Sequence, residues 1–68
     1  MFEIRSEYGT KIPYTPRTYD MACRVAHFMR KLTSYEFMVC ENNRAVSEVF
    51  DLDARKDRYA MTVARRFV

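Results

Sequence analysis

The stretch TYDMACRVAHFMRKL, residues 18–32, carries the clearest structural signal in this 68-residue chain. Its apolar residues recur three and four positions apart, which is the spacing of one face of an α-helix. Thr18 is a good N-cap, Asp20 lies in the first turn, and two basic residues lie in the last turn, as the helix dipole favours. We therefore predict an amphipathic helix over residues 19–32.

The opposite side of this helix carries a polar stripe. Its members are Asp20, Arg24, His27 and Lys31. We expect His27 to face solvent.

The residues before the helix predict an opening hairpin. Phe2 to Glu7 alternates apolar and polar side chains, which is typical of a half-buried strand. Gly9 lies in the turn that follows, where it is free to adopt positive φ. Residues 12–14 are expected to return as a short second strand. Pro13 cannot donate to a ladder, so this strand should lie at an edge of the sheet.

The residues after the helix predict a second hairpin. Residues 35–41 are rich in aromatic and β-branched side chains, as strands are. Asn42 and Asn43 tolerate positive φ and suit a tight turn. Residues 44–52 then form the expected partner strand.

The last segment is consistent with two structures. Tyr59, Met61 and Val63 alternate as in a strand, whereas Asp53 and the Ala, Arg and Met content favour a helix. We predict the strand and keep a helical C-terminal segment as the alternative. The chain is thus expected to be a single α+β domain over residues 1–68, in which one helix packs on one face of a small antiparallel sheet (ββαβββ).

The strand at residues 35–41 is apolar on both sides, which bears on function. Tyr35, Phe37 and Val39 lie on one side, and Met38 and Cys40 lie on the other. One helix covers only one face of a sheet, so something must cover the second face. The candidates are a C-terminal helix, a second copy of the chain in a homodimer, or a partner.

The charges are sorted along the chain. The net charge is +3, and nine of the twelve basic residues are Arg, which suits bidentate contacts to carboxylate or phosphate. Residues 45–53 carry three acidic residues and no base, whereas residues 54–68 carry five bases and one acid. This pattern fits an interaction face or internal ion pairing.

The sequence offers few of the residues that a catalytic or metal site needs. Cys23 and His27 are four residues apart on the predicted helix, but no third residue is placed to orient the histidine. With Cys40 they supply at most three of the four ligands of a closed zinc site. The single glycine excludes a glycine-rich phosphate loop. We expect neither enzymatic activity, nor a cofactor, nor a bound metal.

No apolar run reaches the roughly 18 residues of a membrane span, and the N-terminus does not resemble a signal peptide. Cys23 and Cys40 are expected to be free and structural. We therefore expect a cytoplasmic protein with no membrane partner.

The layout resembles small phage-encoded host-takeover proteins, a group that includes an inhibitor of bacterial RNA polymerase. The resemblance rests on a hairpin ending in Ile12-Pro13, the helix start at residues 18–22, and a following strand, and it covers about half the chain. It implies a phage or mobile-element accessory protein that binds and modulates a host protein.

The sequence thus predicts a small non-catalytic protein-binding module. The alternative is a basic nucleic-acid-binding protein that uses aromatic and Arg side chains on an open sheet face. The residues expected to bind a partner are Tyr35, Phe37, Arg44, Arg58, Tyr59, Arg65 and Arg66.

Overall fold

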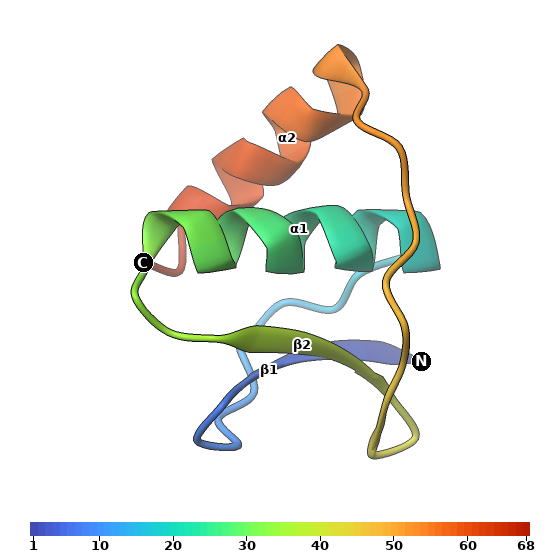
Figure 1. Ribbon diagram of the computed structural model, residues 1–68, viewed down its shortest axis with the longest axis vertical. Coiled ribbons are helices and arrows are strands. Elements are labelled where there is room, and N and C mark those ends of the chain that lie inside the picture. Colours follow the sequence, from blue (N-terminus) through green and yellow to red (C-terminus); the bar gives the residue numbers. More distant parts are fainter.

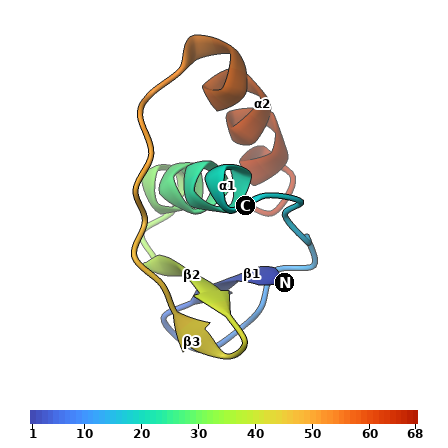
Figure 2. The ribbon, with the colours of Figure 1, turned by 90° about the vertical axis from the view of Figure 1, so that its right-hand side faces the viewer.

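The computed structural model describes all 68 residues and contains three strands and two helices. In chain order these elements are β1 (Phe2–Ser6), α1 (Tyr19–Leu32), β2 (Phe37–Glu41), β3 (Arg44–Ala45) and α2 (Ala54–Arg65). They form three layers, in which α1 lies between the sheet and α2 (Figures 1 and 2). The predicted α+β class is confirmed, although the element order is βαββα rather than ββαβββ.

The predicted helix is present as α1, with the predicted bounds. The Thr18 hydroxyl accepts a hydrogen bond from the Met21 amide at 3.1 Å, as an N-cap does. At the other end, the Thr33 hydroxyl donates to the Met29 carbonyl at 2.8 Å. Because α1 is the middle layer, it buries residues on more than one side. The buried residues are Ala22, Cys23, Arg24, Val25, Ala26, Phe28 and Met29.

The polar stripe of α1 is only partly exposed, which corrects the sequence prediction. Arg24 is 3% exposed. His27 is half-buried between the rings of Phe28 and Phe50, with centroid distances of 5.0 and 5.5 Å. The segment that joins β3 to α2, together with α2 itself, covers this side of α1. A local sequence pattern cannot reveal such coverage.

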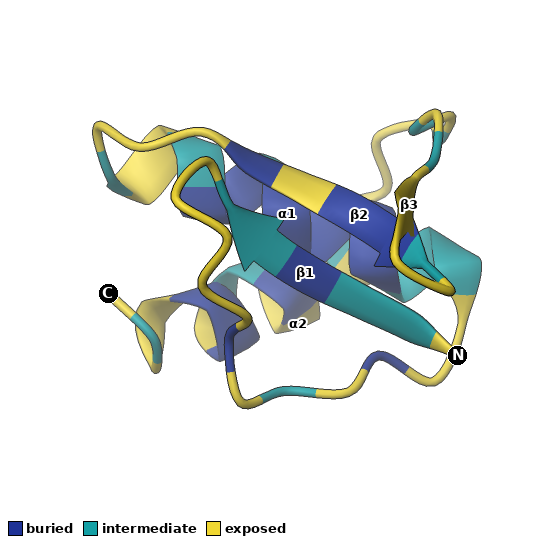
Figure 3. Ribbon diagram, turned by 90° about the horizontal axis from the view of Figure 1, so that it is seen from below, coloured by how far each residue is buried: buried dark blue, intermediate teal, exposed yellow.

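The sheet is antiparallel in the order β1-β2-β3. Ile4 pairs with Val39, and both are fully buried beneath α1. The predicted Asn42-Asn43 turn is confirmed, with φ angles of 51° and 66° in the left-handed region that Asn tolerates. The sheet thus covers one side of α1 and leaves its own outer face open (Figure 3).

The expected second strand at residues 12–14 is reduced to a single bridge. Lys11 pairs with Arg5, and the Ile12 amide donates to the Ile4 carbonyl at 3.0 Å. Pro13 has no amide hydrogen with which to continue the ladder. The hairpin nevertheless closes around Gly9, whose φ is 82°.

The strand expected over residues 44–52 ends at Ala45. The remaining segment crosses α1 on its way from the sheet to the start of α2 (Figures 1 and 2). The Tyr19 hydroxyl donates to the Ser47 carbonyl and accepts from the Val49 amide, which holds the segment against α1. Glu48 forms an ion pair with Arg30 at 2.9 Å. These side-chain contacts to α1 replace the strand pairing that the sequence suggested.

The outer face of the sheet is open, and it carries ion-paired side chains. Glu3 forms ion pairs with Arg5 at 2.8 Å and with Lys11 at 3.6 Å. Cys40 lies between its partners on the flanking strands and is buried, whereas Met38 is 37% exposed. Nothing in the chain covers this face, because α2 packs on α1 and contacts no strand. The large apolar patch expected here is therefore absent.

The C-terminal strand prediction is wrong, and the helical alternative is correct. The residues of α2 that are buried against α1 are Ala60, Val63 and Ala64, which repeat with helical spacing. Tyr59, which set the apparent strand alternation, is 58% exposed. Neither helix combines the length and apolar composition needed to cross a membrane.

Mild acid is expected to destabilise the protein through His27. Burial, together with the nearby cations Lys31 and Arg30, lowers the pKa of His27, while Asp57 and Glu48 act in the opposite direction. The unfolded chain therefore takes up a proton below about pH 6.5 that the folded protein resists, so stability falls as the pH drops through this range. Urea denaturation at several pH values measures how steeply the free energy of unfolding changes with pH.

His27→Gln is the control for this prediction. It removes the only histidine in the chain, so its stability should be nearly flat between about pH 7 and 5. An equal slope in both proteins would contradict the assignment to His27.

Candidate functional site

Helix α2 begins at a well-defined cap. The Asp53 carboxylate accepts hydrogen bonds from the Arg55 amide at 3.0 Å and the Lys56 amide at 3.2 Å. In return, Asp57 accepts from the Asp53 amide at 2.9 Å. These bonds satisfy amides that a helix start otherwise leaves without partners. The cap therefore fixes where α2 begins, and the burial of Ala60, Val63 and Ala64 turns the opposite side of the helix to solvent.

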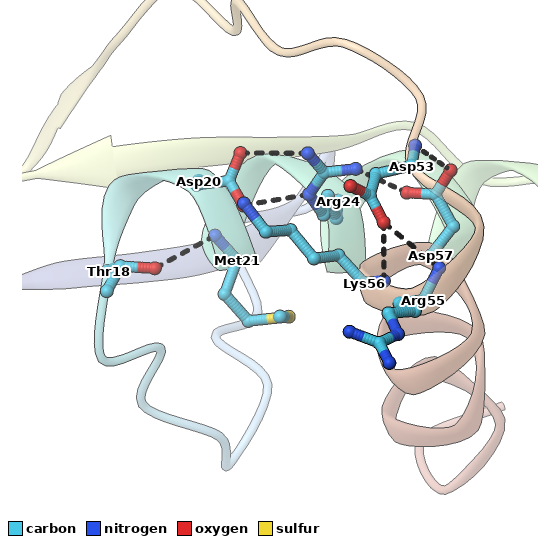
Figure 4. A network of polar contacts seen from close by, with 8 residues as sticks. All are labelled: Thr18, Asp20, Met21, Arg24, Asp53, Arg55, Lys56 and Asp57. Carbon is cyan, nitrogen blue, oxygen red and sulfur yellow. Dashed lines mark hydrogen bonds and ion pairs between the residues drawn. The ribbon is translucent and has the colours of Figure 1, made fainter.

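A buried arginine holds α2 to α1 (Figure 4). Arg24 contacts Asp20 on its own helix at 2.8 Å and Asp57 on α2 at 2.5 Å. Its guanidinium also lies 5.2 Å from the centre of the Phe50 ring. The Arg24 guanidinium lowers the pKa of Asp20, and the two carboxylates raise the pKa of Arg24. This network sets the orientation of α2 on the body.

The outer side of α2 is a row of arginines that lack internal partners. Arg55, Arg58, Arg65 and Arg66 are exposed and form neither ion pairs nor side-chain hydrogen bonds. Tyr59 and Thr62 lie between them, and we call this surface the arginine face. In Figure 4 the Arg55 guanidinium points away from the Arg24 network. The row spans about 16 Å along the helix.

Three of the five arginines elsewhere are paired, whereas Arg17 and Arg44 are exposed and form no ion pair. Arg5, Arg24 and Arg30 are all in ion pairs. Residues 1–53 hold seven basic and eight acidic residues, whereas residues 54–68 hold five basic and one acidic. The one acidic residue, Asp57, is bound by Arg24. The net positive charge of the protein therefore comes entirely from α2 and the residues that follow it.

The structure brings together four of the seven predicted partner-binding residues. Arg58, Tyr59, Arg65 and Arg66 all lie on the arginine face or at its end. Arg55 belongs to the same surface and was not among the predicted residues. A helical wheel over residues 54–66 would have placed it there, since Arg55 and Arg58 are three residues apart.

The other three predicted residues lie elsewhere. Phe37, which we expected on an open face of the sheet, is instead buried in the core beneath α1. Tyr35 is exposed, but it packs edge-to-face on Tyr8 near the start of β2, with centroids 5.7 Å apart. Arg44 is exposed on β3. Because α2 contacts no strand, these positions do not join the arginine face.

The Cys23–His27 pair lacks the features of an activated nucleophile. Burial raises the pKa of the Cys23 thiol, which holds it protonated at neutral pH. Cys23 and Cys40 are both buried free thiols. No group of three or more His, Cys, Asp or Glu side chains is arranged to hold a metal ion.

Loss of the Asp53 cap is expected to fray α2. Asp53→Ala should lower the free energy of unfolding by about 0.5–2 kcal/mol, since it removes the acceptor for two helix amides. Thermal unfolding followed by circular dichroism measures the change. Asp53→Asn keeps a capping oxygen and should remain close to wild type. Equal losses in both variants would show that charge, rather than capping, matters at this position.

A scan against protein-family models and searches of curated proteins and solved structures find no match to this chain.

Proposed function

We propose that this protein is a non-catalytic binding module that binds nucleic acid through the arginine face of α2. The observation that carries the proposal is the row of exposed arginines, none of which has an internal counter-ion. Arginine binds phosphate through a planar, bidentate fork. Binding of arginine to phosphate releases the cations condensed on a nucleic acid, which makes such contacts favourable at low salt.

The composition of the arginine face favours nucleic acid over protein. Protein interfaces have an apolar core that is enriched in aromatic residues, Met and Arg and depleted of other charged residues. The arginine face instead alternates arginine with Tyr59 and Thr62, and no aliphatic side chain interrupts it. Protein–nucleic-acid interfaces are more polar and much more positive than protein–protein interfaces.

The structure also changes the grounds for a protein partner. That hypothesis depended on a large apolar sheet face, and Phe37, Val39 and Cys40 are buried within the monomer. The exposed outer face carries the Glu3 ion pairs instead. The nucleic-acid hypothesis was based on aromatic and Arg side chains on the sheet. The exposed arginines that now support it lie on α2 instead.

An acidic protein remains the second candidate partner. Val49 and Leu52, on the segment leading into α2, are 76% and 74% exposed. Exposed aliphatic side chains beside arginines are suited to a protein contact. If this candidate is correct, the partner is a host protein of the kind that the phage-protein resemblance implies.

Fluorescence anisotropy with labelled oligonucleotides of arbitrary sequence separates the two candidates. The proposal predicts binding at about 50 mM salt that weakens steeply toward about 200 mM, because bound phosphates release counter-ions. Absence of binding at low salt would exclude the nucleic-acid function. An acidic protein would then be the candidate to pursue.

A further inference from the structure

A hollow of about 460 Å³ opens beside the arginine face, between α2 and the chain that leads into α1. Its size is within the range of pockets that bind small ligands. It is lined by Tyr14, Thr15, Arg17, Thr18, Met21 and Tyr59.

The lining offers two aromatic rings and one free cation. Tyr14 is half-buried and fixed against Phe67, with ring centroids 6.0 Å apart. Tyr59 contributes a largely exposed ring from α2. Arg17 is exposed and forms no ion pair. Burial raises the pKa of Tyr14, and the nearby Tyr59 phenol adds to this, so the Tyr14 hydroxyl stays protonated as a donor.

This combination matches the parts of a nucleotide. Aromatic rings stack on a base, a guanidinium binds a phosphate, and hydroxyl groups bond to base edges or sugar. In a duplex the bases are stacked inside and cannot reach such a hollow, whereas a single strand can turn one base outward.

The hollow also lies on the path that a bound strand would follow. Tyr59 is four residues after Arg55 and seven before Arg66, so the three side chains lie on one side of α2. A backbone bound by these two arginines therefore passes the mouth of the hollow. Single-strand binding sites commonly combine a cationic track with aromatic stacking platforms in this way.

We infer that the hollow binds one unstacked base of a single-stranded nucleic acid, with Tyr59 and Tyr14 beside the base and Arg17 on the adjacent phosphate. This inference rests on the proposed nucleic-acid binding and adds that the partner is single-stranded. Duplexes are held by the arginine face alone and bind more weakly.

Short oligonucleotides containing 2-aminopurine test the inference, because the emission of this base falls when it stacks. Binding of a single strand should quench the emission, and the single strand should bind more tightly than the matching duplex. Tyr59→Ala should abolish the quenching and weaken single-strand binding about 5- to 100-fold, as expected for loss of one base–aromatic stack. Tyr59→Phe should retain both properties.

Tyr35→Ala is the matched control, since Tyr35 is also an exposed tyrosine but lies away from α2. It should leave quenching and affinity unchanged. Equal affinity for single strand and duplex, with Tyr59→Ala at the wild-type level, would overturn the inference and leave the proposed function intact. Absence of binding to either nucleic acid at low salt would overturn both.

Discussion

Arg24→Ala is expected to unfold most of the protein at room temperature. Arg24 is buried and bridges Asp20 on α1 and Asp57 on α2. Removing one partner of a buried ion pair costs up to about 3–5 kcal/mol when the remaining charge stays desolvated, as that of Asp57, whose side chain is 16% exposed, largely does here. One core in a chain of this size supplies a similar amount, about 3–5 kcal/mol. Urea denaturation followed by circular dichroism measures the loss.

Lys31→Ala provides the control on the same helix. Lys31 is exposed and forms no ion pair, so its removal should change the free energy of unfolding by at most about 0.5 kcal/mol. A wild-type stability for Arg24→Ala would show that the network does not hold α2 in place.

A double variant separates loss of the ion pair from loss of packing. Arg24→Met alone keeps much of the side-chain volume but leaves the Asp57 carboxylate without its cation. Adding Asp57→Asn removes that charge and keeps an oxygen for the Asp53 amide, so the double variant should be more stable than Arg24→Met. If the loss of stability in the double variant equals the sum of the losses in Arg24→Met alone and Asp57→Asn alone, the two side chains are not coupled and this prediction is contradicted.

Arg58→Gln combined with Arg65→Gln should weaken nucleic-acid binding strongly and leave the fold unchanged. Both side chains are exposed and form no ion pair that the folded protein would lose. If each contacts one phosphate, the slope of log affinity against log salt should fall by about 1.4–1.8. At low salt the dissociation constant should rise on the order of tenfold or more. Salt-dependent anisotropy measures both quantities.

Lys31→Gln combined with Arg44→Gln removes the same charge from elsewhere on the surface. Both residues are exposed and unpaired, and neither belongs to the arginine face. This control should retain nearly the wild-type salt slope. If the two double variants weaken binding equally, net charge rather than the arginine face determines affinity.

The sequence predicted the elements whose signals are local. The cap and periodicity of α1 lie within residues 18–32, and the Asn42-Asn43 turn depends on the φ preference of asparagine itself. Neither requires knowledge of a distant partner. These elements therefore appear in the structure with the predicted bounds.

Elements that depend on distant partners were predicted less well. Residues 54–65 form a helix because Ala60, Val63 and Ala64 pack on α1, a surface that the segment's own pattern does not reveal. Arg24 is buried because Asp57, 33 residues later, reaches it. On the short pattern of residues 18–32, Arg24 is indistinguishable from a solvent-facing arginine.

The candidate site shows the same division. The sequence identified the arginine-rich C-terminal segment and four residues of the arginine face, because the uneven distribution of charge along the chain can be seen without knowing the fold. It did not align Arg55 with them, because the strand interpretation leaves Arg55 in a turn before the strand, and only a helix places Arg55 and Arg58 on one side. It also placed Phe37 at the surface, because alternation alone does not tell which face of β2 lies against α1.

The central claim is that the arginine face of α2 binds nucleic acid, and amide chemical-shift mapping tests it most directly. A titration of the isotope-labelled protein with a short single strand at low salt would report every backbone amide at once. The account predicts that the largest changes fall on residues 54–66, with smaller ones at residues 14–18, and that β1 and β2 are unaffected. Changes concentrated on the outer face of the sheet, with α2 unperturbed, would contradict it.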